Sequence, residues 1–205
     1  MKLYYSPGAC SFAPHLALHE AGVAADAIKV DLRSHKTSDG ADYYAVNPKG
    51  YVPFLVFDDG TTLSEAHVIL QYIADRKPGT IAPAYGTMER YKVNEWLGYV
   101  ATEIHKSYSP LWHPEEFGEK AVDALKQKLH KRYGIVEAQL AKTSYLAGNA
   151  YSIADMYLYT VTNWAHHLKI DLSGFPKVQA WQKKIAERPA VAATQAVERG
   201  VKQPA

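Results

Sequence analysis

The sequence predicts a small α/β domain followed by an all-helical domain. Strand and helix signals alternate over residues 1–76, whereas the chain beyond residue 86 carries only helical periodicity. Residues 77–86, KPGTIAPAYG, lie between the two regions, and their two prolines and two glycines are typical of a linker. We therefore expect one domain over residues 1–78 and a second over residues 87–205.

The first domain opens with the order strand, helix, strand. Residues 2–5 form a strand-like run that ends at the turn residues 6–8. A helix follows and ends at Gly22, because glycine adopts the left-handed conformation that closes many helices. Polar and apolar residues then alternate between 28 and 32, which predicts a second strand, and residues 33–47 predict a loop with a short helical turn.

A hairpin and another helix complete this domain. Residues 52–57 are an apolar run, and the turn at 58–61 contains Asp-Gly, which supplies the positive φ angles of a tight hairpin. The chain returns as a strand at Thr62, and Ser64 is the expected N-cap of the next helix. This order pairs some strands parallel and others antiparallel, so we expect a mixed sheet.

The second domain is expected to contain only helices. Apolar residues at helical spacing mark one helix between 93 and 104 and another between 122 and 140. Further helices begin at Ser152 and at Pro176, and the last is expected to stop near Pro189, because proline cannot continue a helix.

One motif in this domain is assigned to folding. Ser152 and Asp155 form the serine-x-x-acid signature of a helix N-terminus, and Tyr151 and Met156 flank it at the positions of a hydrophobic staple. Its loss should lower stability and leave any chemistry intact.

The composition excludes several classes of function. The 23 Lys and Arg residues nearly balance the 21 Asp and Glu residues, so no basic surface for nucleic acid is expected. No apolar run approaches the ~20 residues that span a bilayer, and the N-terminus shows no signal peptide. A single cysteine fits a reducing compartment, so we expect a soluble cytoplasmic protein. His15 and His19 share a helix face without a third ligand, so no metal site is expected.

Cys10 is the main candidate for chemistry. It follows Pro7 and Gly8 at the expected start of the first helix, where free N–H groups and the helix dipole favour an anion. A thiol at that position is expected to have a lowered pKa and to be partly ionised. The alternative is a buried, inert cysteine.

Two further segments are candidates for ligand contact. Proline is tolerated at the first residue of a strand, and a cis Val52–Pro53 bond would leave the Val52 backbone groups to a ligand. Glu65 lies in the first turn of a helix whose N-terminus favours a carboxylate, and its own carboxylate can pair with an amine. A γ-glutamyl group carries both charges on one carbon. Helix capping alone is the alternative role for this segment.

His105 ends a stripe of small residues. Gly98, Ala101, Thr102 and His105 follow the helical spacing i, i+3, i+4, i+7, so they are expected on one face, where small side chains let a ligand approach. His105 and Lys106 stand at the end of this stripe, where a cation meets an anionic partner. A surface or helix-capping histidine is the alternative.

The segments that hold these candidates resemble those of the glutathione transferase family. YYSPGACS, NPKGYVPFL, SEA, TEIHKSYSPLW and SIADMYLYT occur in the family's order and spacing, and the likeness covers nearly the whole chain. Within the family the chain resembles the bacterial beta class, in which a cysteine replaces the usual tyrosine or serine. The resemblance implies a thioredoxin-like first domain, a helical second domain, a homodimer, and glutathione as co-substrate.

The resemblance also implies roles for individual residues. Cys10 and His105 would be catalytic, with Cys10 beside the glutathione sulfur and His105 assisting the thiol or an electrophile. The expected glutathione-binding residues are Val52, cis Pro53, Glu65, Ala66, His35, Lys36, Ser11, Tyr5, Glu103 and Lys106.

Several of these positions depart from the family pattern or carry a second interpretation. His35 stands where relatives often have a lysine that holds the glycyl carboxylate, so the neighbouring Lys36 is an alternative ligand. Gly98 stands where relatives often have asparagine. Tyr5 is read as a strand residue that lines the site, and Glu103 is expected to reach across the dimer. The expected second-substrate pocket contains Tyr108, Trp112 and Trp164, with core packing as an equal alternative.

These roles predict transfer of glutathione to a small electrophilic substrate, or reduction of a disulfide or peroxide by glutathione. Cys10 favours the redox reaction, because it can form a mixed disulfide with the peptide. Two alternatives remain open. One is a non-catalytic carrier of apolar ligands or protein partners, which the replacements at His35 and Gly98 favour. The other is a monothiol, glutaredoxin-like reductase.

Overall fold

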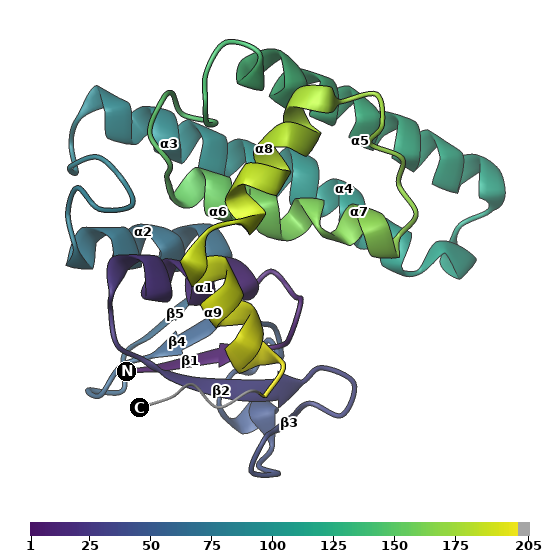
Figure 1. The fold of residues 1–205 in the computed structure, drawn as a ribbon. Helices are drawn as coiled ribbons and strands as arrows, with labels where there is room; N and C mark the ends of the chain where they lie inside the picture. Colours follow the sequence, from purple (N-terminus) through teal and green to yellow (C-terminus); the bar gives the residue numbers. More distant parts are fainter. Residues whose placement is uncertain (201–205) are drawn as a thin grey trace. The chain divides into compact units, whose positions relative to one another are not determined.

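The computed structural model describes residues 1–200 as two units, each with its own core (Figure 1). The first unit contains residues 1–85 together with residues 187–200, and the second contains residues 86–186. Strands occur only in the first of these units among the described residues, which confirms the expected order of an α/β domain and an all-helical domain. None of the described helices is both long and apolar enough to cross a lipid bilayer.

A five-stranded mixed sheet forms the base of the first unit. The strand β1 (Lys2–Tyr5) lies at its centre, parallel to β2 (Asp26–Asp31) and antiparallel to β4 (Phe54–Val56). The edges are β3 (Lys36–Thr37) and β5 (Thr62–Ser64), which gives the order β3-β2-β1-β4-β5. The mixed sheet and the hairpin are as expected. The strand β3 was not predicted, because two residues carry no readable alternation.

Two helices of the first unit follow the expected order. The helix α1 (Phe12–Ala21) ends at Gly22, which has a φ of +61° and takes the left-handed C-cap conformation. The helix α2 (Ala66–Arg76) follows β5, and the short helical turn expected before residue 47 is η1 (Tyr43–Ala45). A core of buried side chains on one side of the sheet contains Tyr4, Val30, Tyr43, Val52 and Phe54.

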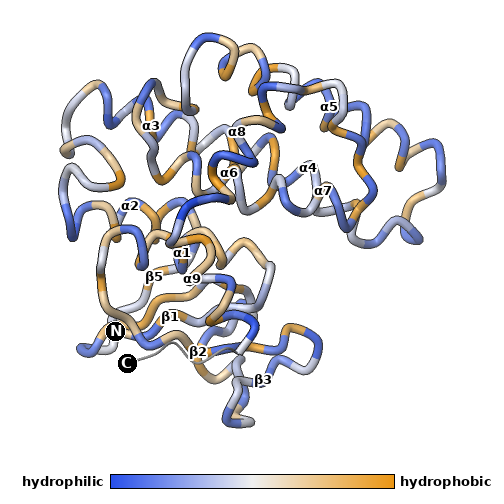
Figure 2. Tube along the Cα trace, viewed as in Figure 1, coloured by the Kyte–Doolittle hydropathy of each residue, from blue (hydrophilic) through white to orange (hydrophobic). Residues whose placement is uncertain are grey.

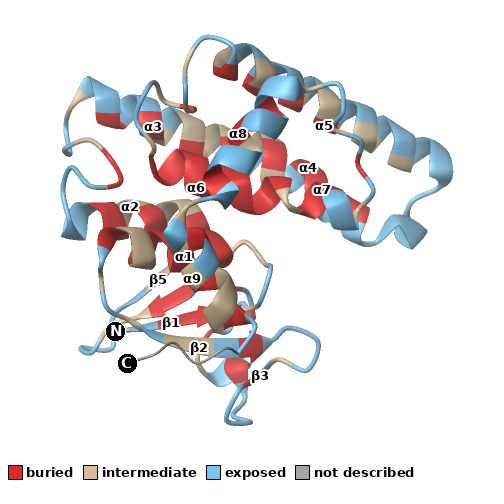
Figure 3. Ribbon diagram, in the orientation of Figure 1, coloured by how far each residue is buried: buried red, intermediate tan, exposed pale blue. Residues whose placement is uncertain are grey.

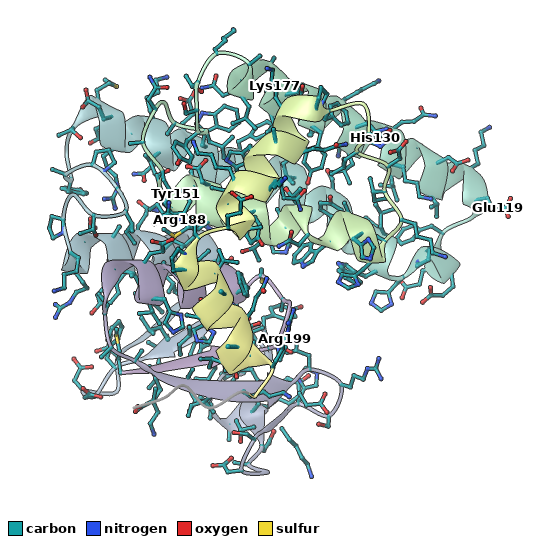
Figure 4. All side chains as sticks on the ribbon, in the orientation of Figure 1. Glu119, His130, Tyr151, Lys177, Arg188 and Arg199 are labelled. Atoms are coloured by element: carbon teal, nitrogen blue, oxygen red, sulfur yellow. The ribbon has the colours of Figure 1, made fainter. Side chains whose placement is uncertain are left out.

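A third helix of this unit comes from the end of the chain. The helix α9 (Pro189–Glu198) belongs to the first unit, so the second unit ends at Ala186 and not at residue 205. Arg188, labelled in Figure 4, joins α9 to α1 through a bidentate contact with Glu20, in which Nη2 lies 2.9 Å from Oε2. The helix that begins at Pro176 ends at Ala186, so the expected stop near Pro189 is confirmed. The start of α9 at Pro189 was not predicted, because proline is also tolerated at the first helical position, where its missing N–H costs nothing.

The second unit consists of helices and loops. Its main helices are α3 (Met88–Tyr99), α5 (Glu119–Leu140), α6 (Ile153–Thr162), α7 (Trp164–His167) and α8 (Pro176–Ala186). All residues of α6 are buried, as Figure 3 shows, so α6 is the centre of this unit. Figure 2 shows hydrophilic and hydrophobic residues in alternation along α5, as expected for a helix with one face in the core and one in solvent.

The helix geometry changes just before His105. The segment η2 (Val100–His105) is π-helical and leads into the short helix α4 (Lys106–Tyr108). A π-helical turn is closed by i→i+5 hydrogen bonds and therefore contains an additional residue. The α-helical spacing that placed Gly98 and His105 on one stripe does not hold across η2, so that prediction is wrong.

The capping motif of α6 is confirmed. Ser152 and Asp155 form a reciprocal capping box, and the buried Asp155 carboxylate also accepts hydrogen bonds from Leu146 N and from Trp181 Nε1, both at 3.0 Å. Burial raises the pKa of Asp155 to about 6, against the opposing effect of these donors. The motif therefore joins the start of α6 to α8 and to the loop before it.

Asp155→Ala is expected to lower the free energy of unfolding by about 3 kcal/mol, because several buried donors lose their acceptor at once. Urea unfolding followed by circular dichroism measures this. The matched control is Asp123→Ala, at an exposed position on α5, which should keep the wild-type midpoint. Equal midpoints for the Asp155 variant and the wild type would contradict the assigned folding role.

Candidate functional site

Cys10 lies in the turn between β1 and α1, two residues before the first helical residue, Phe12. Its carbonyl accepts a hydrogen bond from Ala13 N at 3.2 Å, so the turn leads directly into the helix. The side chain is half-buried, and Sγ donates to the carbonyl oxygen of Val52 at 3.2 Å. A thiol that donates in this bond carries its proton, so forming the thiolate requires this bond to break.

Buried side chains hold this turn from both sides. Ser11 is fully buried, and its hydroxyl accepts from Ser6 N at 3.1 Å and donates to Ser6 O at 3.2 Å. Glu198, on α9, accepts from Gly8 N at 3.0 Å through Oε2, and its Oε1 lies 3.1 Å from Nδ1 of the buried His15. The hydroxyl proton of Ser11 is therefore used within the protein, which gives Ser11 a structural role in the turn. Its contact with a ligand stays a prediction.

Tyr5 is a buried strand residue beside the same turn. Its ring lies 4.9 Å from the ring of His15, and burial together with the charge of Glu198 raises the pKa of Tyr5 above its ordinary value. The phenol therefore keeps its proton at neutral pH. This environment does not favour a tyrosine that acts through its phenolate, and the site-lining role of Tyr5 stays a prediction.

The segment opposite Cys10 is fixed by two buried donors. Tyr43 Oη and Asn47 Nδ2 each donate to the carbonyl of Tyr51 at 2.8 Å. The following peptide bond, Val52–Pro53, is cis as expected, and β4 begins only at Phe54. Within residues 1–200, the Val52 N–H has no hydrogen-bond partner. Its carbonyl faces Cys10, so both backbone groups of Val52 lie outside the sheet ladder.

His35 packs against this segment. It has a φ of +50°, and its ring lies 4.4 Å from that of Tyr44. A Cβ added to Gly50 would lie 2.6 Å from Cε1 of Tyr44 and 3.2 Å from Cε1 of His35, so the ring pair rests on the Gly50 backbone. Lys36 is exposed on the edge strand β3, paired in register with Asp31. Of the two expected ligands, His35 is therefore the one beside the Val52 segment.

The start of α2 differs from expectation. Ser64 is the last residue of β5, and Glu65 is the N-cap, with a φ of +70° and no side-chain capping bond. The prediction of Ser64 as the N-cap is therefore wrong, because the strand continues through it. Lys49 Nζ donates to the Ser64 hydroxyl at 3.2 Å. A non-glycine residue at positive φ is strained, and such residues cluster at ligand sites, which suits Glu65 and the buried Ala66 to that role.

His105 lies at the end of η2 in the second unit. Its Nδ1 is 2.7 Å from the hydroxyl of Tyr157, and its ring packs edge-to-face on Trp164 with centroids 4.9 Å apart. Burial, followed by the charge of Lys106, lowers the pKa of His105 to about 4. The imidazole is therefore neutral at pH 7, so the positive charge at this point comes from the exposed Lys106 and not from His105.

Glu103 already has a partner within its own unit. Arg132 Nε donates to Glu103 Oε2 at 2.7 Å, and the backbone carbonyl of Arg132 accepts from Tyr99 Oη at 2.9 Å. This contact connects η2 to α5. The expected reach of Glu103 across a dimer would have to compete with this ion pair.

The three aromatic residues expected in the second-substrate pocket have different environments. Tyr108 is fully buried, and its hydroxyl is 2.9 Å from that of Tyr133, which donates to Thr162 Oγ1 at 3.0 Å. This environment favours the core-packing alternative for Tyr108. Trp164 is also buried, but Trp112 is 44% exposed and packs edge-to-face on it with centroids 5.8 Å apart. Trp112 is therefore the member that a ligand can reach.

Two other features of the second unit were not expected. A cavity of about 510 Å³ lies between α3 and α5 and contains none of the predicted pocket residues. Its lining residues are Lys92, Glu95, Trp96, Tyr99, Ile135, Gln139, Thr143, Leu146, Ala147 and Gly148. Separately, His113, Glu115 and Glu116 bring ligand atoms within 4.8 Å of one another, but all three are exposed, as is common for acidic groups without a metal.

Sequence reasoning missed four supporting residues. Asn47 had a signal, because Asn-Pro is typical of a turn. Tyr43 had none, because nothing in the sequence pairs its hydroxyl with the backbone of Tyr51. Tyr157 and Glu198 had none, since each acts through a partner that is distant along the chain.

Comparisons with known proteins are consistent with this geometry. The family models named glutathione S-transferase, N-terminal domain, and glutathione S-transferase, C-terminal domain, match residues 8–76 and 99–189. Glutathione S-transferase GstA of Escherichia coli O157:H7 is 42% identical over 193 residues, which cover 93% of this chain and 95% of the relative.

Two solved structures are also similar. A sphingomonad glutathione S-transferase complexed with glutathione is 42% identical with a TM-score of 0.92, covering 97% of this chain and 99% of that one. A beta-class glutathione S-transferase of Sphingomonas chungbukensis is 42% identical with a TM-score of 0.91, covering 98% and 100%.

The neutral state of His105 predicts a pH dependence of stability. Its pKa is about 4 in the folded chain and about 6.5 when unfolded, so the unfolded chain binds more protons between these values. The free energy of unfolding should therefore fall by up to about 3 kcal/mol as pH drops from 6.5 to 4. His105→Phe should remove this part of the slope in urea titrations at several pH values. The control His113→Phe, at an exposed position, should retain it. Identical slopes for His105→Phe and the wild type would refute the assignment.

Proposed function

The chain belongs to the glutathione S-transferase family, and we propose that it binds glutathione at the Cys10 and Val52 segments and transfers its sulfur to an electrophilic substrate. Its architecture is a thioredoxin-like domain followed by an all-helical domain, and its relatives include bacterial beta-class enzymes, as the sequence motifs predict. The observation that carries the proposal is the pair of Val52 backbone groups that lie outside the sheet ladder, with the N–H unpaired among residues 1–200 and the carbonyl accepting only from the Cys10 thiol.

In this proposal, the cysteinyl part of glutathione pairs with the N–H and carbonyl of Val52. A new donor at the Val52 carbonyl competes with the Cys10 thiol, which frees Sγ beside the incoming sulfur. The γ-glutamyl group lies at the start of α2, where its carboxylate meets the free N–H groups and its amine meets Glu65. His35, which packs on Gly50, is proposed for the glycyl end in preference to Lys36.

Conjugation then requires the glutathione sulfur as thiolate, which attacks the electrophilic carbon while the leaving group departs with its electron pair. His105 and Lys106 are proposed to support this step from the helical domain. The exposed Trp112 is the proposed contact for an apolar part of the second substrate.

Cys10 adds a thiol-exchange reaction to this scheme. Its thiolate attacks the glutathionyl sulfur of a mixed disulfide, R–S–SG, which releases RS⁻ and leaves Cys10 bonded to glutathione. A second glutathione thiolate attacks that bond, so that oxidised glutathione leaves and the Cys10 thiolate returns. The single cysteine supports a cycle in which free glutathione resolves the intermediate.

We also propose a homodimer in the cytoplasm. The exposed apolar side chains Met88 and Tyr91 on α3 and Ile135 on α5 provide a surface that a second copy can cover. The lone thiol fits a reducing compartment. Sedimentation velocity at micromolar concentration should give the mass of two chains, and a monomer peak would refute the dimer.

Cys10→Ala separates the two reactions. The variant should lose disulfide reductase activity by at least ~100-fold, because no mixed disulfide can form, and should keep conjugation of an activated aryl halide within ~10-fold. Initial rates with each substrate measure this. Equal retention of both activities would remove Cys10 from the mechanism. Retention of the wild type on immobilised glutathione without turnover of any substrate would favour a carrier.

A further inference from the structure

The two ring nitrogens of His105 have different environments. Nδ1 is 2.7 Å from the hydroxyl of Tyr157, a residue of α6 that is 3% exposed. Nε2 has no hydrogen-bond partner among residues 1–200, and the residue as a whole is only partly buried. One nitrogen is therefore held by the protein, and the other is left for a reactant.

The ring cannot easily rotate to exchange these roles. It packs edge-to-face on Trp164 with an interplanar angle of 68°, and on the ring of Tyr157 with an angle of 89°. Trp164 is itself fixed by the buried ring of Tyr108, at a centroid distance of 5.7 Å. The Tyr157 contact is thus a stable feature of the helical unit. It is made to His105, for which the family resemblance implies a catalytic role.

The chemistry of the two groups decides which one donates. A phenol hydroxyl is far more acidic than the N–H of a neutral imidazole, and an imidazole nitrogen is a better acceptor than a phenol oxygen. Burial lowers the pKa of His105, so the ring carries a single proton at neutral pH. The favoured arrangement is donation from Tyr157 Oη to Nδ1, which places the only ring proton on Nε2.

We propose that Tyr157 is a positioning residue that fixes His105 as the Nε2–H tautomer, so that His105 acts as a hydrogen-bond donor and not as a general base. An N–H directed at a reactant stabilises the anionic sulfur of glutathione, or the negative charge that develops on the electrophile. The catalytic part of this inference rests on the proposed transferase function. The tautomer does not, because it is a property of the free protein.

Nitrogen-15 NMR of the wild type, with label confined to histidine, tests the tautomer directly at pH 7. The expected spectrum for His105, assigned by its loss in His105→Phe, has a pyrrole-type shift for Nε2 and a pyridine-type shift for Nδ1. A pyrrole-type Nδ1 would overturn the proposal without any variant of Tyr157.

Tyr157→Phe tests the positioning role. The variant should let the tautomers mix and should lower kcat for conjugation ~10-fold, while KM for glutathione stays within ~2-fold. The matched control is Tyr159→Phe, because Tyr159 is equally buried on the same helix, whereas the hydroxyl bonded to His105 Nδ1 is that of Tyr157. The control should keep both the wild-type tautomer and kcat. An unchanged tautomer in Tyr157→Phe, or an unchanged kcat despite tautomer mixing, would refute the positioning role. A wild type that turns over no electrophile would instead refute the proposed function.

Discussion

The candidate glutathione site depends on one contact between two loops, the hydrogen bond from the Cys10 thiol to the Val52 carbonyl. Neither loop has regular secondary structure, so each needs support from the core to keep its place. Ser11 and Glu198 hold the Cys10 turn, and Tyr43 and Asn47 hold the Val52 segment through the carbonyl of Tyr51. Because these supports are buried, the site is preorganised, and binding energy is not consumed in ordering the loops.

In the helical unit, buried side chains likewise hold a candidate catalytic residue in place. A π-helical segment carries His105, whose ring is held by Tyr157 and Trp164, and the buried carboxylate of Asp155 fixes the start of the helix that supplies Tyr157. The helix α6 therefore carries both a residue that stabilises the fold, Asp155, and a residue that contacts His105, Tyr157. A change at Asp155 acts on stability first, whereas a change at Tyr157 acts on the protonation pattern of His105.

The sequence predicted the order of the elements well, because strand alternation, the Asp-Gly turn, Gly22 and the capping box are local signals. The sequence-based predictions failed where a local pattern is compatible with two structures, or where no local pattern exists. Pro189 follows the end of α8, as expected, but it also begins α9, which was not predicted. The α-helical spacing to His105 does not account for the π-helical segment. Tyr108 has the pattern of a pocket aromatic, and only the packing of Tyr133 and Thr162 shows that it belongs to the core. Glu198 could not be found at all, since its partner Gly8 lies at the other end of the chain.

A crystal structure of the protein with glutathione tests the central claim most directly. It should show the cysteinyl backbone of the peptide bonded to the N–H and carbonyl of Val52, with the peptide sulfur next to Sγ of Cys10. The Cys10 and Val52 loops should keep their present conformations, as expected for a preorganised site. Glutathione bound at another place, or a complex in which both loops have changed conformation, would contradict the account.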